Sequence, residues 1–241
     1  MIIEIERNLT RKGEVLLSLS PLFISLKVAF VATFITIFIG IAAARYVLKV
    51  RRFKGFIDGV FTLPLVLPPT VVGFFLLTIF GKNSLIGKFL LQFDVAIVFT
   101  WTGAVIASTV VAFPLMYRTV RGAFEQFDIS IIHAARTLGM SEAKIFWRII
   151  IPNVIPSIIA GTILAFARAL GEFGATIMLA GNIPGRTQTM AIAIYTSVQA
   201  GDRAKAYSWA IIICMMSFTA IILMNFWNKL QYKKSAKRSD F

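Results

Sequence analysis

The sequence predicts an all-α polytopic membrane protein with about five transmembrane helices. Hydrophobic residues make up 58% of the chain and charged residues only 15%, and the mean hydropathy is +0.81, which lies outside the range of soluble globular domains. The apolar residues also fall into stretches of about 20, the length that an α-helix needs to cross a ~30 Å hydrocarbon core. One polytopic domain therefore accounts for most of the chain.

The first three predicted spans cover residues 22–44, 57–79 and 95–117. Five basic residues and no acidic residue follow the first span, which places that loop in the cytoplasm under the positive-inside rule; they are Arg45, Lys49, Arg51, Arg52 and Lys54. After the third span, Arg118 and Arg121 return the chain to the cytoplasm. Lys27, near the outer end of the first span, is expected to reach the headgroups.

Two further spans are predicted at residues 154–179 and 207–227. Residues 191–198 are apolar but too short to cross, so we expect a re-entrant or interfacial segment on the outer side. The predicted organisation is an N-terminal extracytoplasmic lead-in (1–17), a transmembrane domain (18–228) and a basic cytoplasmic tail (229–241). Five crossings put the N-terminus outside and the C-terminus in the cytoplasm.

Several function classes are not expected. The net charge is +14, but most basic residues flank spans on one side, so no nucleic-acid partner is expected. With one Cys and one His, we expect no metal, no cofactor and no catalytic residues. The sequence also lacks the G-x-x-x-x-G-K-[ST] loop that cradles nucleotide phosphates, so this chain is not expected to hydrolyse ATP.

The segment after the third span is long for a loop and is patterned as two helices. Asp128 or Ser130 can cap the first helix, and Gly139 offers the left-handed conformation that ends it. Ser141 can cap a second helix that stops before Pro152. The first helix has barely two turns and needs a surface to hold it. The pattern leaves open whether that surface is a partner's groove or the inner leaflet.

The run HAARTLGMSEAKIFWRIIIP resembles the EAA loop of ABC importer permeases, here within residues 125–152. Small residues and Pro152 stand at the family's spacing, and His133 stands where Glu is usual. The resemblance implies a type I ABC importer permease fold, a homodimer, an extracytoplasmic binding protein and a cytoplasmic ATPase subunit into which the loop docks as a coupling helix. The implied docking residues are His133, Ala134, Ala135, Leu138 and Gly139.

Three further stretches resemble molybdate permeases: LPLVLPPTVVGFFLL, AFPLMYRTVRGAFE and FARALGEFGATIMLAGNIPGRTQT. Sulfate permeases are similar in all three but usually have Tyr where Phe173 stands. The resemblance implies ATP-driven molybdate import by alternating access. Tungstate, a tetrahedral oxyanion of nearly the same size, fits equally, and a sulfate or thiosulfate permease is the alternative. A rival of another class is an ion-coupled secondary transporter or channel.

Prolines mark the second span as a candidate pathway wall. Pro64, Pro68 and Pro69 remove backbone donors and must kink the helix, leaving carbonyls to groups such as Thr70. A gate and a packing kink are both open interpretations.

The fourth span carries an acidic residue, Glu172, where an unpaired charge would be costly. Arg168 lies one turn earlier and is expected to neutralise it. Gly171 and Gly174 flank the acid and are interpreted as places where the partner chain's helix approaches closely. The pair either lines the pathway or only fixes helix packing.

The loop after this span holds turn formers and one cation. Asn182 and Arg186 are the candidate contacts for a binding protein. An ordinary solvated turn is the alternative.

Overall fold

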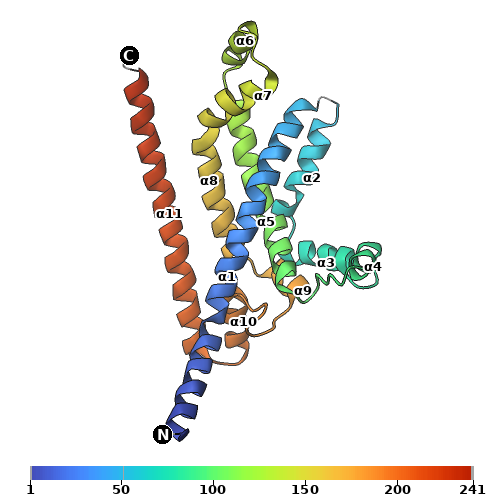
Figure 1. Cartoon of the computed structure of the whole chain (residues 1–241), viewed down its shortest axis with the longest axis vertical. Coiled ribbons are helices and arrows are strands. Elements are labelled where there is room, and N and C mark those ends of the chain that lie inside the picture. The colour runs from blue at the N-terminus through green and yellow to red at the C-terminus, as the bar shows by residue number, and fades with distance from the viewer. Residues whose placement is uncertain (1, 51, 240–241) are drawn as a thin grey trace.

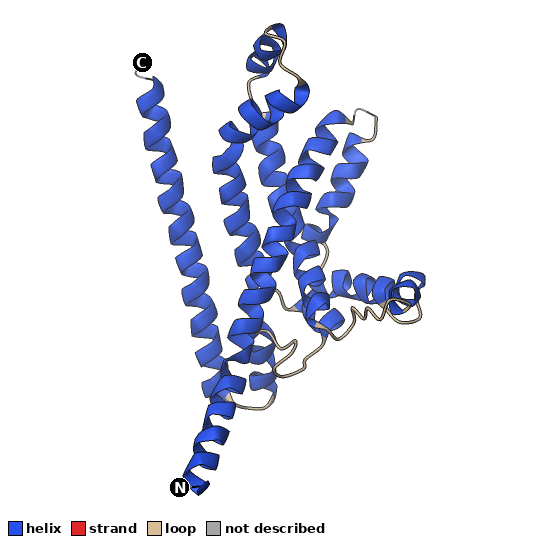
Figure 2. Cartoon of the chain, viewed as in Figure 1, coloured by secondary structure: helices blue, strands red, loops and turns tan. Residues whose placement is uncertain are grey.

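The computed structural model describes residues 2–50 and 52–239, and every regular element among them is a helix (Figure 2). In chain order these are α1 (Ile2–Lys49), α2 (Lys54–Val66), α3 (Pro69–Phe80), α4 (Leu85–Leu91), α5 (Trp101–Glu125), α6 (Ile129–Thr137), α7 (Glu142–Ile145), the π-helix η1 (Phe146–Ile150), α8 (Ile151–Leu170), α9 (Gly174–Ala180), α10 (Met190–Gln199) and α11 (Arg203–Ser239).

Four helical stretches in the described residues are long and apolar enough to cross a membrane. They are Leu19–Lys49, Trp101–Glu125, Glu142–Leu170 and Arg203–Leu223. The pair α2 and α3 makes a fifth if it counts as one broken span. The expected multi-pass helical architecture is therefore confirmed.

Helices α1, α5 and α8 pack against one another along their lengths and form the centre of the bundle (Figure 1). Val28, Met116 and Ala165, one from each helix, are almost fully buried there. Since lipid is as apolar as these side chains, close van der Waals contact holds the helices together. Helix α11 packs against α8 and α10, and α3 with α4 projects sideways from the bundle.

The two ends of the bundle differ. One end, called here the α6 end, carries α6, α7 and the C-terminal part of α11; the other, the α10 end, carries α10 and the start of α1 (Figure 1). At the α10 end, the Lys27 ammonium lies 4.2 Å from the centre of the Trp101 ring. Such a cation–π contact gives the charge a partner near the end of the span.

The second predicted span is broken rather than kinked. The chain bends by 112° between α2 and α3, because Leu67 and Pro68 have extended backbones with ψ of 141° and 134°. Neither Pro68 nor Pro69 can donate a backbone hydrogen bond, and a residue that precedes proline is pushed out of the helical region. Two consecutive prolines therefore end α2 and start a new helix in another direction.

The third predicted span was placed too early. Helix α5 begins at Trp101 and continues to Glu125, so Arg118 and Arg121 lie in the helix and not in a loop. The Thr100 hydroxyl caps the start by accepting from the Gly103 backbone N–H at 3.3 Å. Residues 95–100 form a loop that the backbone N–H of Phe99 ties to the carbonyl of Leu179 at 3.0 Å.

The fourth predicted span was placed too far along the chain. Helix α8 ends at Leu170, and α9 is a separate short helix. The backbone between them is non-helical at Phe173, with φ of −124°. Residue Glu172 is therefore at a helix break, not deep inside one helix.

The remaining segments lie closer to expectation. Helix α10, over residues 190–199, is too short to cross and packs on α1 and α11; the Met190 backbone N–H donates to the Ser25 hydroxyl at 2.8 Å. Helix α1 runs unbroken across the proposed 17/18 boundary, and α11 runs across 228/229. The lead-in and the tail thus continue as helix from the spans beside them.

Candidate functional site

The loop between α5 and α8 folds as the two capped helices that the sequence predicts. The Asp128 carboxylate accepts from the Ser130 backbone N–H at 2.9 Å, and hydrogen bonds from that amide and the Ser130 hydroxyl hold the pKa of Asp128 below its usual range. Gly139 ends α6 with φ of +74°, a conformation that glycine adopts without steric cost. Ser141 then caps α7 by accepting from the Lys144 backbone N–H at 3.4 Å.

The predicted docking residues divide into two groups. His133, Ala134, Leu138 and Gly139 are exposed, and the Leu138 side chain is 81% exposed. Ala135 is 4% exposed, so its methyl group faces the chain's own interior and is not available as a direct contact. Of these five residues, the exposed ones are apolar or small except for His133, and the rest of the exposed surface of α6 is mixed, with Ile129 and Ile131 beside Arg136 and Thr137.

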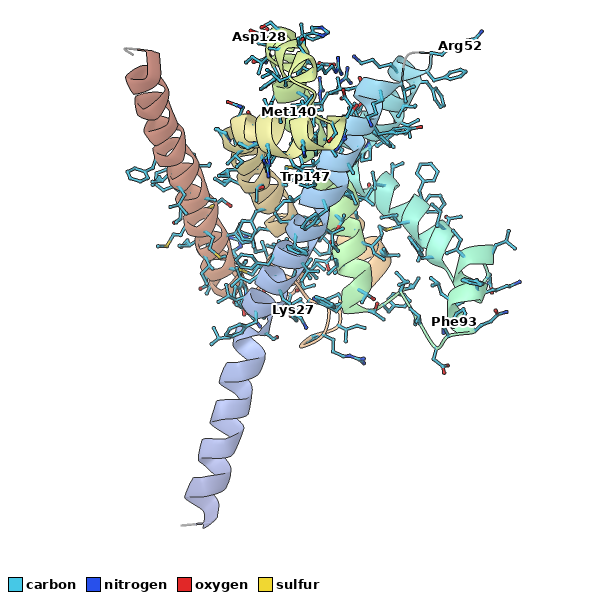
Figure 3. All side chains as sticks on the ribbon, turned by 45° about the horizontal axis from the view of Figure 1, so that its top comes forward. Lys27, Arg52, Phe93, Asp128, Met140 and Trp147 are labelled. Carbon is cyan, nitrogen blue, oxygen red and sulfur yellow. The ribbon has the colours of Figure 1, made fainter. Side chains whose placement is uncertain are left out.

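The second loop helix does not stop before Pro152, contrary to the sequence-based expectation. Helix α7 continues through η1 into α8 (Figure 3). The Ile151 backbone N–H bonds the carbonyl of Phe146, five residues back, and the Asn153 side-chain amide donates to the Ile149 carbonyl at 2.7 Å. The π register and the Asn153 side chain thus pair backbone groups next to Pro152, which has no N–H to donate, so the helix continues without a break.

Phe146 fixes the loop to the bundle. It is 6% exposed; the Arg45 guanidinium of α1 lies 3.7 Å from its ring centre, and the Phe124 ring of α5 lies at 6.0 Å. Helices α6 and α7 are joined across their turn by an ion pair between Arg136 and Glu142 at 2.6 Å. The loop is thus one unit held on α1 and α5.

The two helix breaks in the transmembrane region lie against each other. A Cβ atom added at Gly174 would lie 2.9 Å from Pro69 Cβ and 3.0 Å from the Thr70 backbone nitrogen, and one at Gly73 would lie 2.8 Å from Ala175 Cα. Gly174 therefore permits close approach of α3 of the same chain, not of a partner chain's helix as the sequence suggested.

The other pathway candidates lie near these breaks. Pro64 is inside α2, whereas Pro68 and Pro69 form the break itself. Thr70 and Gly171 are exposed, and a Cβ atom added at Gly171 would meet only the Ala167 carbonyl oxygen, at 3.7 Å. The prolines therefore act at two different places in the fold.

Arg168 and Glu172 form an ion pair at the α8–α9 break. Arg168 Nη1 donates to Glu172 Oε2 at 2.7 Å, and Glu172 Oε1 accepts from the Ala175 backbone N–H at 2.7 Å. The Glu172 side chain is 1% exposed and the Arg168 side chain 30%. The carboxylate is therefore satisfied on both oxygens, and it also stabilises the N-terminus of α9.

At the α10 end, the loop after α9 folds against the loop before α5. Asn182 is exposed and accepts from the Gln188 side-chain amide at 3.0 Å. Exposed Arg186 lines a hollow of about 510 Å³ together with Asp94, Thr102 and Thr187. Of the two predicted contact residues, Arg186 lines this hollow with Asp94, which the sequence did not single out, and Asn182 does not.

Within the described residues, no group of three His, Cys, Asp or Glu side chains is placed to hold a metal ion. The geometry offers an exposed helix, α6, at one end, an exposed polar loop at the other, and a pair of broken helices between them. Broken helices within a transmembrane bundle are a feature of proteins that pass solutes across membranes.

Comparison with known proteins identifies the family. Residues 36–235 match the family described as the binding-protein-dependent transport system inner membrane component. The chain belongs to this permease family. As such, it is a non-enzymatic, multi-pass membrane component of a transport system.

Curated relatives of this permease match over most of their lengths. The putative molybdenum transport system permease protein YvgM of Bacillus subtilis is 46% identical over 85% of this chain and 91% of its own. The molybdenum transport system permease protein ModB of Escherichia coli K12 is 39% identical over 89% of this chain and 95% of its own. The sulfate transport system permease protein CysT of Salmonella typhimurium is 34% identical over 84% and 73%.

Solved structures share the fold of this permease. A chain of the MetNI methionine ABC transporter has a TM-score of 0.68 at 14% identity, covering 88% of this chain and 95% of that chain. A chain of a bacterial ABC transporter for the acidic polysaccharide alginate, in complex with a periplasmic protein, has a TM-score of 0.70 at 14% identity, covering 89% and 78%. The fold is that of type I ABC importer permeases, as the sequence predicted.

Proposed function

We propose that this permease moves molybdate into the cell as the membrane subunit of an ATP-driven importer. The substrate is inferred from sequence identity to known permeases. Relatives at 39–46% identity are named for molybdenum transport, and a sulfate permease follows at 34%. Tungstate shares the charge and tetrahedral shape of molybdate and is expected to be carried as well.

The ATPase partner docks at the exposed face of α6. Leu138 and its neighbours place apolar surface at the end of the bundle, where no described part of the chain covers it. A two-turn helix is stabilised by insertion into a groove, and the caps at Asp128 and Gly139 fix its length. The α6 end is then cytoplasmic, which places the start of α1 outside and the C-terminus inside.

A binding protein delivers the anion at the α10 end. Arg186 and Asp94 line one hollow there, so this surface carries both charge signs and suits contact with a charged protein surface. Asn182 lies exposed in the same loop as Arg186. A second copy of the chain completes the pathway. The hollows between the helices of one copy, such as the one that α1, α8 and α11 line, have mostly apolar side chains and do not suit a dianion.

Passage of the anion follows alternating access at the two broken helices. The short helices α3 and α9 begin at breaks where backbone groups are free of helical pairing, and such breaks are where membrane transporters bind and gate solutes. Arg168 neutralises Glu172 there, so that the pathway presents no unpaired carboxylate to a dianion.

Uptake by proteoliposomes tests this proposal. The permease is reconstituted with its ATPase and binding protein, and radioactive molybdate uptake is measured with and without ATP. Uptake is expected to require ATP and both partners and to be inhibited by unlabelled tungstate more strongly than by sulfate. Stronger inhibition by sulfate would make the chain a sulfate permease, and uptake without ATP or ATPase would make it a secondary transporter or channel.

A further inference from the structure

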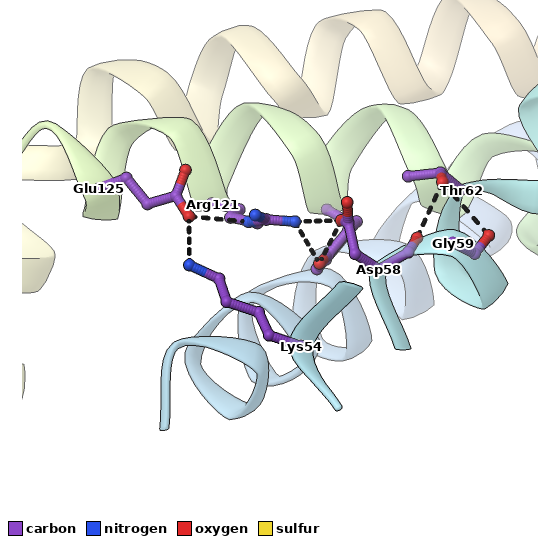
Figure 4. Close-up of polar contacts among 7 residues, drawn as sticks. Lys54, Asp58, Gly59, Thr62, Arg121 and Glu125 are labelled. Carbon is purple, nitrogen blue, oxygen red and sulfur yellow. Dashed lines mark hydrogen bonds and ion pairs between the residues drawn. The ribbon is translucent and has the colours of Figure 1, made fainter. Parts of the chain in front are cut away.

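Four charged side chains join the α6 ends of α2 and α5 (Figure 4). Arg121 lies at the centre and donates to two carboxylates, Asp58 and Glu125, the latter at 3.0 Å from its Nε. Lys54 Nζ contacts the same Glu125 oxygen at 3.0 Å, and the Tyr117 hydroxyl donates to Asp58 Oδ1 at 2.9 Å. These five residues are called here the α2–α5 cluster.

The cluster carries no net charge, and its hydrogen bonds have fixed directions. Two positive and two negative charges cancel, and Arg121, at 17% side-chain exposure, is the most enclosed of the four. A guanidinium holds two carboxylates in fixed directions because its donors lie in one plane, which an ammonium group cannot do. Tyr117 is itself held by the rings of Phe61 and Phe113, whose centres lie 5.3 and 5.8 Å from its own.

The position of the cluster connects two functional parts of the permease. Glu125 is the last residue of α5 and lies just before Asp128, which caps α6. On the other side, Lys54 begins α2, whose far end is the break at Pro68. That break packs directly on Gly174 at the start of α9. The cluster therefore links the loop between α5 and α8, through polar contacts, to α2, the helix that ends at the Pro68 break.

We propose that the α2–α5 cluster makes α2 move together with the loop, with Arg121 as the positioning residue that transmits ATPase-driven motion to the break at Pro68. This inference rests on the proposed function, because it assumes that motion enters at α6. Covalent continuity alone would carry that motion along α5; the charge-assisted bonds extend it to α2, whose own link to α1 is the basic loop around residue 52.

The alternative is that the cluster only holds two helices in place. A packing role would lower the amount or stability of assembled transporter and leave the ATP used per transported anion unchanged. A transmission role changes that ratio in transporter that is assembled normally, since hydrolysis would proceed while α2 lags behind the loop. The ratio of ATP hydrolysed to molybdate taken up therefore separates the two.

The experiment measures this ratio in proteoliposomes that hold equal amounts of purified, assembled complex. Arg121→Gln is expected to raise it about tenfold, because the guanidinium bonds to Asp58, Glu125 and the Tyr117 hydroxyl are lost. Tyr117→Phe is expected to raise it about threefold, because the hydroxyl loses its bond to Asp58 and the one it accepts from Arg121, while the ring and all charges stay. Arg121→Lys is expected to fall between the wild type and Arg121→Gln, since it keeps the charge without the fork. Arg52→Gln is the control: it removes a cation from the same side of the membrane, and Arg52 points away from the bundle (Figure 3).

Two results would overturn the inference. One is a wild-type ratio in both Tyr117→Phe and Arg121→Gln; the other is a parallel fall of uptake and hydrolysis at constant ratio. If Arg121→Gln does not assemble, Tyr117→Phe decides alone. Failure of the proposed function shows differently, as wild-type uptake that needs no ATP.

Discussion

Removing either partner of the Arg168–Glu172 pair is expected to destabilise the permease to different extents. In Arg168→Gln, a carboxylate that is 1% exposed loses its cation, and an uncompensated buried charge costs about 3–5 kcal/mol. In Glu172→Gln, the group left without a partner is a guanidinium that is 30% exposed and can be hydrated. The amide can still accept from Ala175, so this variant is expected to lose about 1.5–3 kcal/mol.

Thermal unfolding of the purified variants in detergent tests this order. The wild type is expected to unfold at the highest temperature, Glu172→Gln next and Arg168→Gln lowest. The double variant Arg168→Gln/Glu172→Gln should unfold above Arg168→Gln, because it leaves no buried charge. If Glu172→Gln is the less stable single variant, or if the double variant is the least stable of all, the argument from burial is wrong. Unchanged transport in both single variants would remove the pair from the pathway and leave it a packing role.

Three further predictions concern the loop and the breaks. Gly139→Asp is expected to uncouple ATP hydrolysis from uptake. It should cost only about 1 kcal/mol of stability, since the new Cβ would meet nothing within 4 Å and Asp tolerates positive φ. Wild-type coupling in this variant would refute docking at this turn. Gly174→Ala should cost about 1–3 kcal/mol by overpacking against Pro69. Gly171→Ala, whose Cβ would meet only the Ala167 carbonyl oxygen at an ordinary contact distance of 3.7 Å, should unfold within a degree or two of the wild type. Equal losses would contradict the close contact of the breaks. Because folding lowers the pKa of Asp128, its cap stabilises α6 above the unfolded-state pKa and is lost as pH falls through the lowered value. The protection of the α6 amides, measured as the exchange rate relative to the intrinsic rate at each pH, should therefore fall at acid pH in the wild type and be low at all pH in Asp128→Ala. A wild-type pH profile of protection in that variant would show that the cap has no part in it.

The loop was well predicted from the sequence because its signals are local. Asp128, Gly139 and Ser141 each act within a few residues through a cap or a left-handed turn, and such effects need no knowledge of distant contacts. The prediction that Pro152 ends the second helix was wrong for a related reason. A proline normally interrupts a helix, but the π register between Phe146 and Ile151 removes the need for its missing donor, and nothing in the local pattern signals that register.

Span boundaries were predicted less well because hydropathy does not detect breaks in apolar sequence. Residues 95–100 are apolar enough to extend a span, yet the Thr100 cap and the bond from Phe99 to Leu179 place them in a loop. The end of α8 depends instead on a side-chain direction, because Glu172 turns to accept from the Ala175 backbone N–H three residues on and caps α9. Both contacts join segments far apart in sequence or require a side-chain direction that periodicity does not give.

Asp58 shows how far the sequence alone can identify the partner of a charged residue in a span. An acidic residue inside an apolar span is costly unless it is paired, so its presence alone indicates a partner. The same argument correctly led from Glu172 to Arg168, because that partner lies one helical turn away. For Asp58, the cation one turn away is Lys54, which bonds Glu125 instead, and the actual partners, Tyr117 and Arg121, lie on α5. Helix periodicity identifies partners within a helix, and only the fold identifies partners between helices. Asp58, whose neighbouring cation one turn away bonds a different acid, is therefore a position at which only the fold shows the contact between helices, and that contact leads from the α6 loop toward the broken span.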